Sequence, residues 1–218
     1  MGIMNLWNKI RKANAEDELM LSDRKVSALL KKIDDKGYTP TDEEIAALKR
    51  VESISFNSIP KSIDILTNLK QLRLWFSKNT IGLSGTENLT NLQCLDLSFS
   101  KNISLSGIEN LTNLQWLNLS STQIDSHELK RLSKLKNLTS LDLRHLKITK
   151  IPYQLLELNL PFDTTNKDPS CLERGIFLHG TVLTQQSLRL FKKDRSLIEK
   201  YYKSEIASVG GAEETNNS

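Results

Sequence analysis

Four segments of the chain repeat one spacing of leucines, and this spacing limits the folds available to it. Residues 66–74, 89–97, 111–119 and 135–143 each contain leucine at the first, fourth, seventh and ninth positions. The seventh-position leucines, Leu72, Leu95, Leu117 and Leu141, follow one another at steps of 23, 22 and 24 residues. A period in this range indicates a solenoid, in which each unit stacks on the next.

The spacing within one unit predicts its local structure. Side chains alternate along a strand, so the leucine-x-leucine pair places two leucines on one side of a short strand. The two earlier leucines lie three residues apart, as one face of a helical turn requires. A single unit cannot bury its leucines, because it has no second layer. Stacked units would form a parallel sheet over a continuous leucine core, in keeping with 37 leucines against 4 valines.

These motifs resemble those of leucine-rich-repeat proteins, and the units with GIENLTNL are similar to the SDS22-like and bacterial subclasses. The resemblance implies an α/β solenoid, a leucine-rich-repeat horseshoe with a parallel β-sheet on its concave face. Such repeats usually place asparagine after the strand, where its side chain bonds neighbouring backbones in a ladder. Here the corresponding residues are Ser77, Ser100, Thr122 and Leu146. We therefore predict a weaker ladder, because hydroxyl groups replace only some of those bonds.

Helical segments are expected at both ends of the repeats. We predict an N-terminal helical cap over residues 1–50, repeats with about seven strands over 51–183, a C-terminal helical cap over 184–206 and a disordered tail over 207–218. The less regular strands are expected at residues 54–56, 158–160 and 176–178. Thr41 and Glu44 have the spacing of a capping box. The segments GIFLHGTVL at 175–183 and SLIEKYY at 196–202 resemble the end of the repeats in Roco-type proteins. The absence of GxxxxGK[ST] excludes a GTPase for this chain.

Composition argues against several classes of protein. The net charge of +4 arises from 30 basic and 26 acidic residues that are spread evenly, unlike the basic stripe of a nucleic-acid-binding protein. Cys94 and Cys171 are 77 residues apart and lack the spacing of a zinc site. No segment has the length of a membrane span or the layout of a signal peptide. We expect a cytoplasmic monomer that needs no cofactor, metal, nucleic acid or membrane.

Candidates for catalysis are few. His145 and His179 are expected at strand ends on the concave side, and Cys171 lies beside Glu173 and Arg174 in a loop. With another strand between them, the backbones of the two histidines would be roughly 10 Å apart. A hydrolase or ligase that uses His145, His179 or Cys171 is one alternative. The sequence contains none of the common catalytic motifs, so we predict no enzymatic activity.

The side chains that alternate with the leucines favour a protein-binding role. Exposed aromatic residues flanked by charged ones are typical of protein–protein hot spots. We predict that a partner protein contacts Arg73, Trp75, Phe76, Asp96, Phe99, Trp116, Asn118, Asp142, Arg144, His145 and Phe162. The resemblance implies a bacterial protein, and an effector that acts on a host protein is one form of this hypothesis. The alternative is a regulatory or scaffold subunit of a phosphatase or GTPase, in the manner of SDS22-like proteins.

Overall fold

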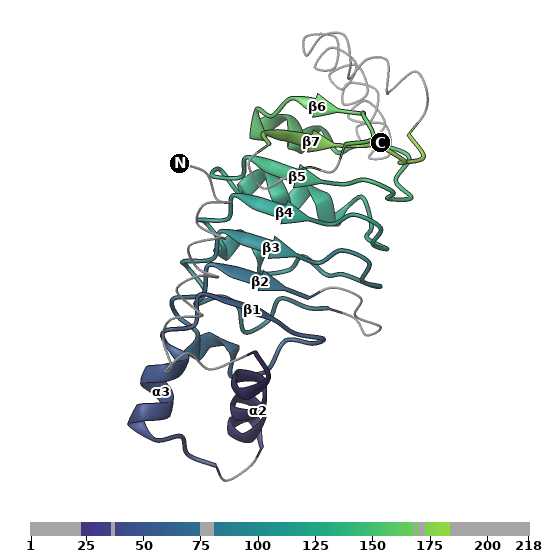
Figure 1. Cartoon of the computed structure of the whole chain (residues 1–218). Coiled ribbons are helices and arrows are strands. Elements are labelled where there is room, and N and C mark those ends of the chain that lie inside the picture. The colour runs from purple at the N-terminus through teal and green to yellow at the C-terminus, as the bar shows by residue number, and fades with distance from the viewer. Residues whose placement is uncertain (1–22, 36–37, 75–80, 168, 170–172, 184–218) are drawn as a thin grey trace, which may run out of the picture.

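The computed structural model describes residues 23–35, 38–74, 81–167, 169 and 173–183. Two α-helices precede a series of short parallel strands, and 3-10 helices connect several of these strands (Figure 1). The elements are α2 (Asp23–Asp34), α3 (Asp42–Leu48), β1 (Ser53–Ser55), η1 (Ile63–Ile65), β2 (Gln71–Arg73), β3 (Cys94–Asp96), η2 (Ile108–Asn110), β4 (Trp116–Asn118), η3 (Glu128–Lys134), β5 (Ser140–Asp142), η4 (Tyr153–Leu158), β6 (Phe162–Asp163) and β7 (Gly175–Phe177). The predicted C-terminal cap and tail lie outside the described residues.

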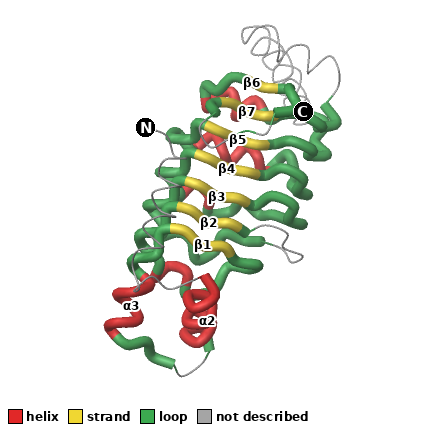
Figure 2. The backbone as a smooth tube through the Cα atoms, viewed as in Figure 1, coloured by secondary structure: helices red, strands yellow, loops and turns green. Residues whose placement is uncertain are grey.

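The strands stack in the register that the leucine spacing predicts. Leu72, Leu95, Leu117 and Leu141 are successive partners across β2 to β5, with Ile54 before them and Ile176 after them. Each of these side chains is at most 1% exposed. The 3-10 helices lie behind the sheet, so the leucines are enclosed between two layers (Figure 2). The parallel solenoid is therefore confirmed.

The order of the last strands differs from the sequence-based expectation. The sheet runs β1-β2-β3-β4-β5-β7-β6, so β7 pairs with β5 and β6 forms the edge. The strand predicted at residues 158–160 is wrong, because Tyr153–Leu158 is a 3-10 helix that buries Leu155 and Leu158. Asn159 then adopts a left-handed conformation, with φ of 53°, and ends that helix. The leucine-x-leucine pattern at this point belongs to the back layer of the solenoid.

An asparagine ladder runs through the described repeats, but its asparagines precede the strands and do not follow them. The asparagine of each LTNL or LKNL segment donates from Nδ2 to a backbone carbonyl of the preceding unit. The four bonds are Asn68 to Lys49 at 2.8 Å, Asn91 to Thr67 at 2.9 Å, Asn113 to Thr90 at 2.7 Å and Asn137 to Thr112 at 2.8 Å. After the strands, Ser100 Oγ donates to the Leu74 carbonyl of the previous unit at 2.7 Å, whereas Thr122 bonds within its own unit. Ser77 lies outside the described residues.

Helices α2 and α3 pack at the β1 end of the sheet (Figure 1). Leu30 and Leu48 are fully buried and belong to the same core as the repeat leucines. The Asp34 carboxylate accepts hydrogen bonds from the backbone N–H groups of Lys61 and Ser62, each at 2.9 Å. The predicted capping box is present, since Thr41 Oγ1 accepts from the Glu44 N–H and Glu44 accepts from the Thr41 N–H. The first repeat is thus continuous with the helices.

Candidate protein-binding face

Two rows of side chains alternate with the buried leucines and form what we call the sheet face. The first row contains Ser53, Gln71, Cys94, Trp116, Ser140 and Gly175, and the second contains Ser55, Arg73, Asp96, Asn118, Asp142 and Phe177. Residues at equal positions on adjacent strands are close enough for their side chains to touch. The sheet face therefore brings Trp116 between Cys94 and Ser140, and Arg73 beside Asp96.

The carboxylates of the sheet face are buried, which corrects the expectation that they are displayed to a partner. Asp96 is 9% exposed and Asp142 is 1% exposed. Asp96 Oδ1 accepts from the Ser98 N–H at 3.0 Å, and Asp142 Oδ1 accepts from the Arg144 N–H at 3.0 Å. Asp142 also forms an ion pair of 2.9 Å with the Arg144 guanidinium. These side chains satisfy backbone donors where the strands end, a role that composition did not reveal.

Like Asp96 and Asp142, Asn118 accepts a hydrogen bond from the backbone N–H two residues later. In each of these units the next residue has a left-handed backbone conformation. Asn118 Oδ1 accepts from the Ser120 N–H at 2.9 Å. Among the described residues, the fourth residue after the central leucine or isoleucine has positive φ in four units: Phe99 at 58°, Ser121 at 56°, His145 at 60° and Gly180 at 71°. Residues other than glycine rarely adopt this backbone conformation, which costs them of the order of 1 kcal/mol. We call this row of four residues the left-handed edge.

Phe99 and Trp116 are the described aromatic residues nearest the centre of the array. Phe99 is 51% exposed, so this large apolar side chain stands out from the left-handed edge. Trp116 is half-buried, and its Nε1 is buried without a hydrogen-bond partner. The burial pattern of β4 turns Trp116 away from the core, as the alternation predicted. Trp75 and Phe76 lie outside the described residues.

Phe162 does not join this aromatic group. It lies in β6 at the edge of the sheet, three strands from β4, which corresponds to roughly 14 Å. Its partly buried side chain packs against the leucine core. Chain order predicts β6 next to β5, but β7 takes that place, so Phe162 lies one strand farther from the other candidates than predicted.

The two histidines are adjacent, and the predicted separation of roughly 10 Å is wrong. Their ring centroids are 5.7 Å apart, with an interplanar angle of 87°. The reason is the direct pairing of β5 with β7, which also lets the His145 N–H donate to the His179 carbonyl at 2.9 Å. Cys171 lies outside the described residues, and Cys94 is buried. Within the described ranges, no group of three or more His, Cys, Asp or Glu side chains could hold a metal ion.

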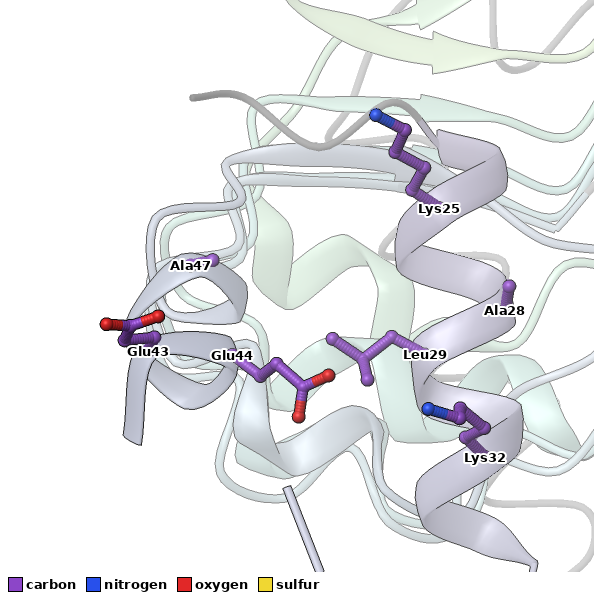
Figure 3. A pocket seen from close by; sticks show the side chains of 7 residues that line it. All are labelled: Lys25, Ala28, Leu29, Lys32, Glu43, Glu44 and Ala47. Carbon is purple, nitrogen blue, oxygen red and sulfur yellow. The ribbon is translucent and has the colours of Figure 1, made fainter. Parts of the chain in front are cut away.

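A groove that no sequence motif indicates lies between α2 and α3 (Figure 3). It is open to solvent, has a volume of about 420 Å³ and is lined by Lys25, Ala28, Leu29, Lys32, Glu43, Glu44 and Ala47. The Tyr38 hydroxyl donates to both Glu44 carboxylate oxygens, at 2.6 and 2.7 Å. This hydrogen bond, together with that from the Thr41 N–H, lowers the pKa of Glu44 below its ordinary value. The Lys32 ammonium lies 4.1 Å from the centre of the Tyr38 ring.

Comparison with solved structures identifies the architecture. A leucine-rich-repeat protein of Leptospira interrogans is similar over 75% of this chain and 39% of its own, with 25% sequence identity and a TM-score of 0.53. An internalin, InlF of Listeria monocytogenes, is similar over 68% of this chain and 40% of its own, with 23% identity and a TM-score of 0.50. The fold is a leucine-rich-repeat solenoid.

This solenoid spans about 40% of the length of both solved relatives. No protein-family model and no curated protein sequence matches the chain. No helix among its described residues is long and apolar enough to cross a membrane. The comparisons thus define the fold.

Proposed function

We propose that this leucine-rich-repeat solenoid is a non-enzymatic protein-binding module. Its partner contacts the left-handed edge and the adjacent part of the sheet face, with Phe99 and Trp116 as the principal anchors. A parallel sheet backed by a rigid leucine core holds such side chains in fixed positions, which lowers the entropy lost on binding.

The observation that carries the proposal is the placement of Phe99. A phenylalanine with φ of 58° occupies a position where glycine would avoid backbone strain, and Gly180 occupies the equivalent position in a later unit. The strained residue also leaves half of an aromatic side chain in contact with solvent. Strain of this kind is concentrated at functional sites, and exposed aromatic residues dominate binding hot spots. The left-handed turn itself belongs to the repeat, because it lets the Phe99 N–H donate to the Ser120 carbonyl at 3.0 Å. The exposed aromatic ring at this position is the feature that binding accounts for.

Trp116 supplies a second, independent reason. An indole N–H that is buried without an acceptor costs about 1–3 kcal/mol. A partner that shifts this side chain slightly and presents a carbonyl or carboxylate oxygen would recover part of that cost. Tryptophan is among the residues most enriched at hot spots because it combines a large apolar surface with one donor.

The test compares Phe99→Ala with Tyr153→Ala. Tyr153 is a matched control because it is 42% exposed but lies on η4 and not on a strand of the sheet. After crosslinked capture and identification of a partner, we expect Phe99→Ala to weaken binding at least tenfold and Tyr153→Ala to leave it unchanged. If Phe99→Ala and the unaltered protein bind the partner with equal affinity, the left-handed edge is not the binding site.

Two kinds of partner protein are considered for this binding module. A bacterial effector that acts on a host protein and a regulatory or scaffold subunit of a phosphatase or GTPase are both compatible with a protein-binding solenoid. Co-purification of the chain with a phosphatase or GTPase from its own cell would favour the second, and binding of a host protein would favour the first. The cytoplasmic location and monomeric state are also proposals, and light scattering after gel filtration tests the latter.

A further inference from the structure

The groove between α2 and α3 is formed by short side chains on the two helices. Ala28 and Ala47 both line it, and alanine leaves room where larger side chains would fill the space between packed helices. Leu29 also lines the groove, and this half-buried side chain packs against the leucine core. Leu29 and Glu44 point toward each other across the space between the helices (Figure 3). The groove is therefore an apolar extension of the core that is open to solvent.

The charged residues that line the groove fall into an engaged pair and a free pair. Lys32 and Glu44 both contact Tyr38, the first 4.1 Å from the centre of its ring and the second through hydrogen bonds of 2.6 and 2.7 Å from its hydroxyl. The Lys25 and Glu43 side chains are exposed, and neither has an ion pair or a hydrogen bond among the described residues. The groove thus offers apolar walls, one free ammonium group and one free carboxylate.

These three features fit an indole ring. A cation over the face of an aromatic ring attracts it, and tryptophan gives the strongest interaction of this kind, so the Lys25 ammonium suits an indole. The indole N–H needs one acceptor, which the Glu43 carboxylate supplies. The volume of about 420 Å³ has room for one tryptophan side chain. The lining therefore favours tryptophan over an aliphatic side chain, which would use neither charge.

We propose that the groove binds the N-terminal segment of this same chain, residues 1–22, with Trp7 as the side chain that enters it. Trp7 precedes Asp23, the first residue of α2, by 16 residues, which span roughly 50 Å when fully extended. Lys25 and Lys32 are seven residues apart on α2, which corresponds to roughly 10 Å along the groove. The segment is long enough to return to the groove, and its attachment to α2 gives Trp7 an effective concentration of about 1 mM there.

The charges of the N-terminal segment complement those of the groove. Three acidic residues at positions 16–18 precede α2, the helix that supplies the lysines of the groove. The basic residues Lys9, Arg11 and Lys12 follow Trp7, and the glutamates of the groove belong to α3. Attraction between these opposite charges stabilises the bound segment and is screened at high salt concentration.

The experiment uses the full chain labelled with fluorotryptophan, in which Trp7→Phe identifies the fluorine signal of Trp7. A soluble gadolinium chelate broadens the NMR signals of exposed side chains. We expect it to broaden the Trp7 signal at least threefold less in the folded protein than in urea. The protection should be the same at low and at twentyfold higher protein concentration, because the segment binds within its own chain.

Three variants make the test specific to the groove. Ala47→Glu and Ala28→Glu each place a charged side chain in it, and Ala28 is exposed, so circular dichroism should show an unchanged fold for Ala28→Glu. Ala46→Glu is the matched control, because Ala46 is exposed on α3 and does not line the groove. Both groove variants should broaden the Trp7 signal at least threefold more than in the unaltered protein, and Ala46→Glu should not.

Three results would overturn the proposal. A Trp7 signal that is as broad in the folded protein as in urea would leave the groove to another protein. Protection that increases with protein concentration would assign the groove to the N-terminal segment of a second copy. Protection that neither Ala47→Glu nor Ala28→Glu reduces would place Trp7 at a different site.

Discussion

The asparagine ladder gives the sharpest test of how the repeats are held together. Asn113 Nδ2 donates to the Thr90 carbonyl at 2.7 Å across the boundary between two units. We expect Asn113→Ala to reduce the free energy of unfolding by about 1 kcal/mol, because a net hydrogen bond contributes about 0.5–1.5 kcal/mol and this one is exposed. For a chain of this size the melting temperature should fall by roughly 2–4 °C.

The buried bond after the strand should contribute more than the exposed one. Ser100 Oγ donates to the Leu74 carbonyl at 2.7 Å inside the structure. Ser100→Ala removes this donor from a buried carbonyl, and a buried group that loses its partner costs about 1–3 kcal/mol. The expected order of destabilisation is therefore Ser100→Ala, then Asn113→Ala.

Two further variants separate the hydrogen bond from the local turn. Asn113→Asp keeps the shape and turn preference of the residue but replaces the donor by an oxygen that faces the Thr90 carbonyl, so it should destabilise at least as much as alanine. Asn110→Ala changes an exposed asparagine three residues earlier and should alter stability by less than about 0.5 kcal/mol. Urea unfolding followed by circular dichroism measures all four. The reasoning fails if Asn110→Ala and Asn113→Ala are equally destabilising, or if Asn113→Asp is neutral.

Two other predictions follow from the described contacts. Tyr38→Phe should raise the pKa of Glu44 toward its ordinary value, since the Tyr38 hydroxyl is the largest cause of its lowering. The ionised Glu44 stabilises the folded state above a pH of about 4.5, and this stabilisation is lost as the pH falls through the lowered pKa. An unchanged NMR titration curve of Glu44 in Tyr38→Phe would contradict the role of the Tyr38 hydroxyl. Gly180→Ala should reduce the free energy of unfolding by about 1–3 kcal/mol, because alanine at positive φ is strained and its Cβ would clash with the His145 ring. In a His145→Ala background the clash is absent, so the same substitution should cost only about 1 kcal/mol. Equal costs in both backgrounds, measured by thermal unfolding, would show that the ring yields freely.

Local pattern alone determined the central part of the fold. The leucines at fixed spacing can be buried only if each strand aligns with its neighbour, because a shift of one residue would turn every leucine outward. The register of Leu72, Leu95, Leu117 and Leu141 and the outward direction of Trp116 could therefore be read from the sequence. The capping box at Thr41 was predictable for the same reason, since it depends on residues three apart.

Only the tertiary structure decided which strand neighbours β5. A leucine-x-leucine pair fits a strand or the buried side of a 3-10 helix equally well, and the local sequence at residues 158–160 does not choose between them. Once η4 takes those leucines, β6 moves to the edge and β7 pairs with β5, which joins residues more than thirty positions apart. The contact between His145 and His179 depends on that pairing. The burial of Asp142 depends on hydrogen bonds with the backbone, whose direction is set by the turn that follows the strand.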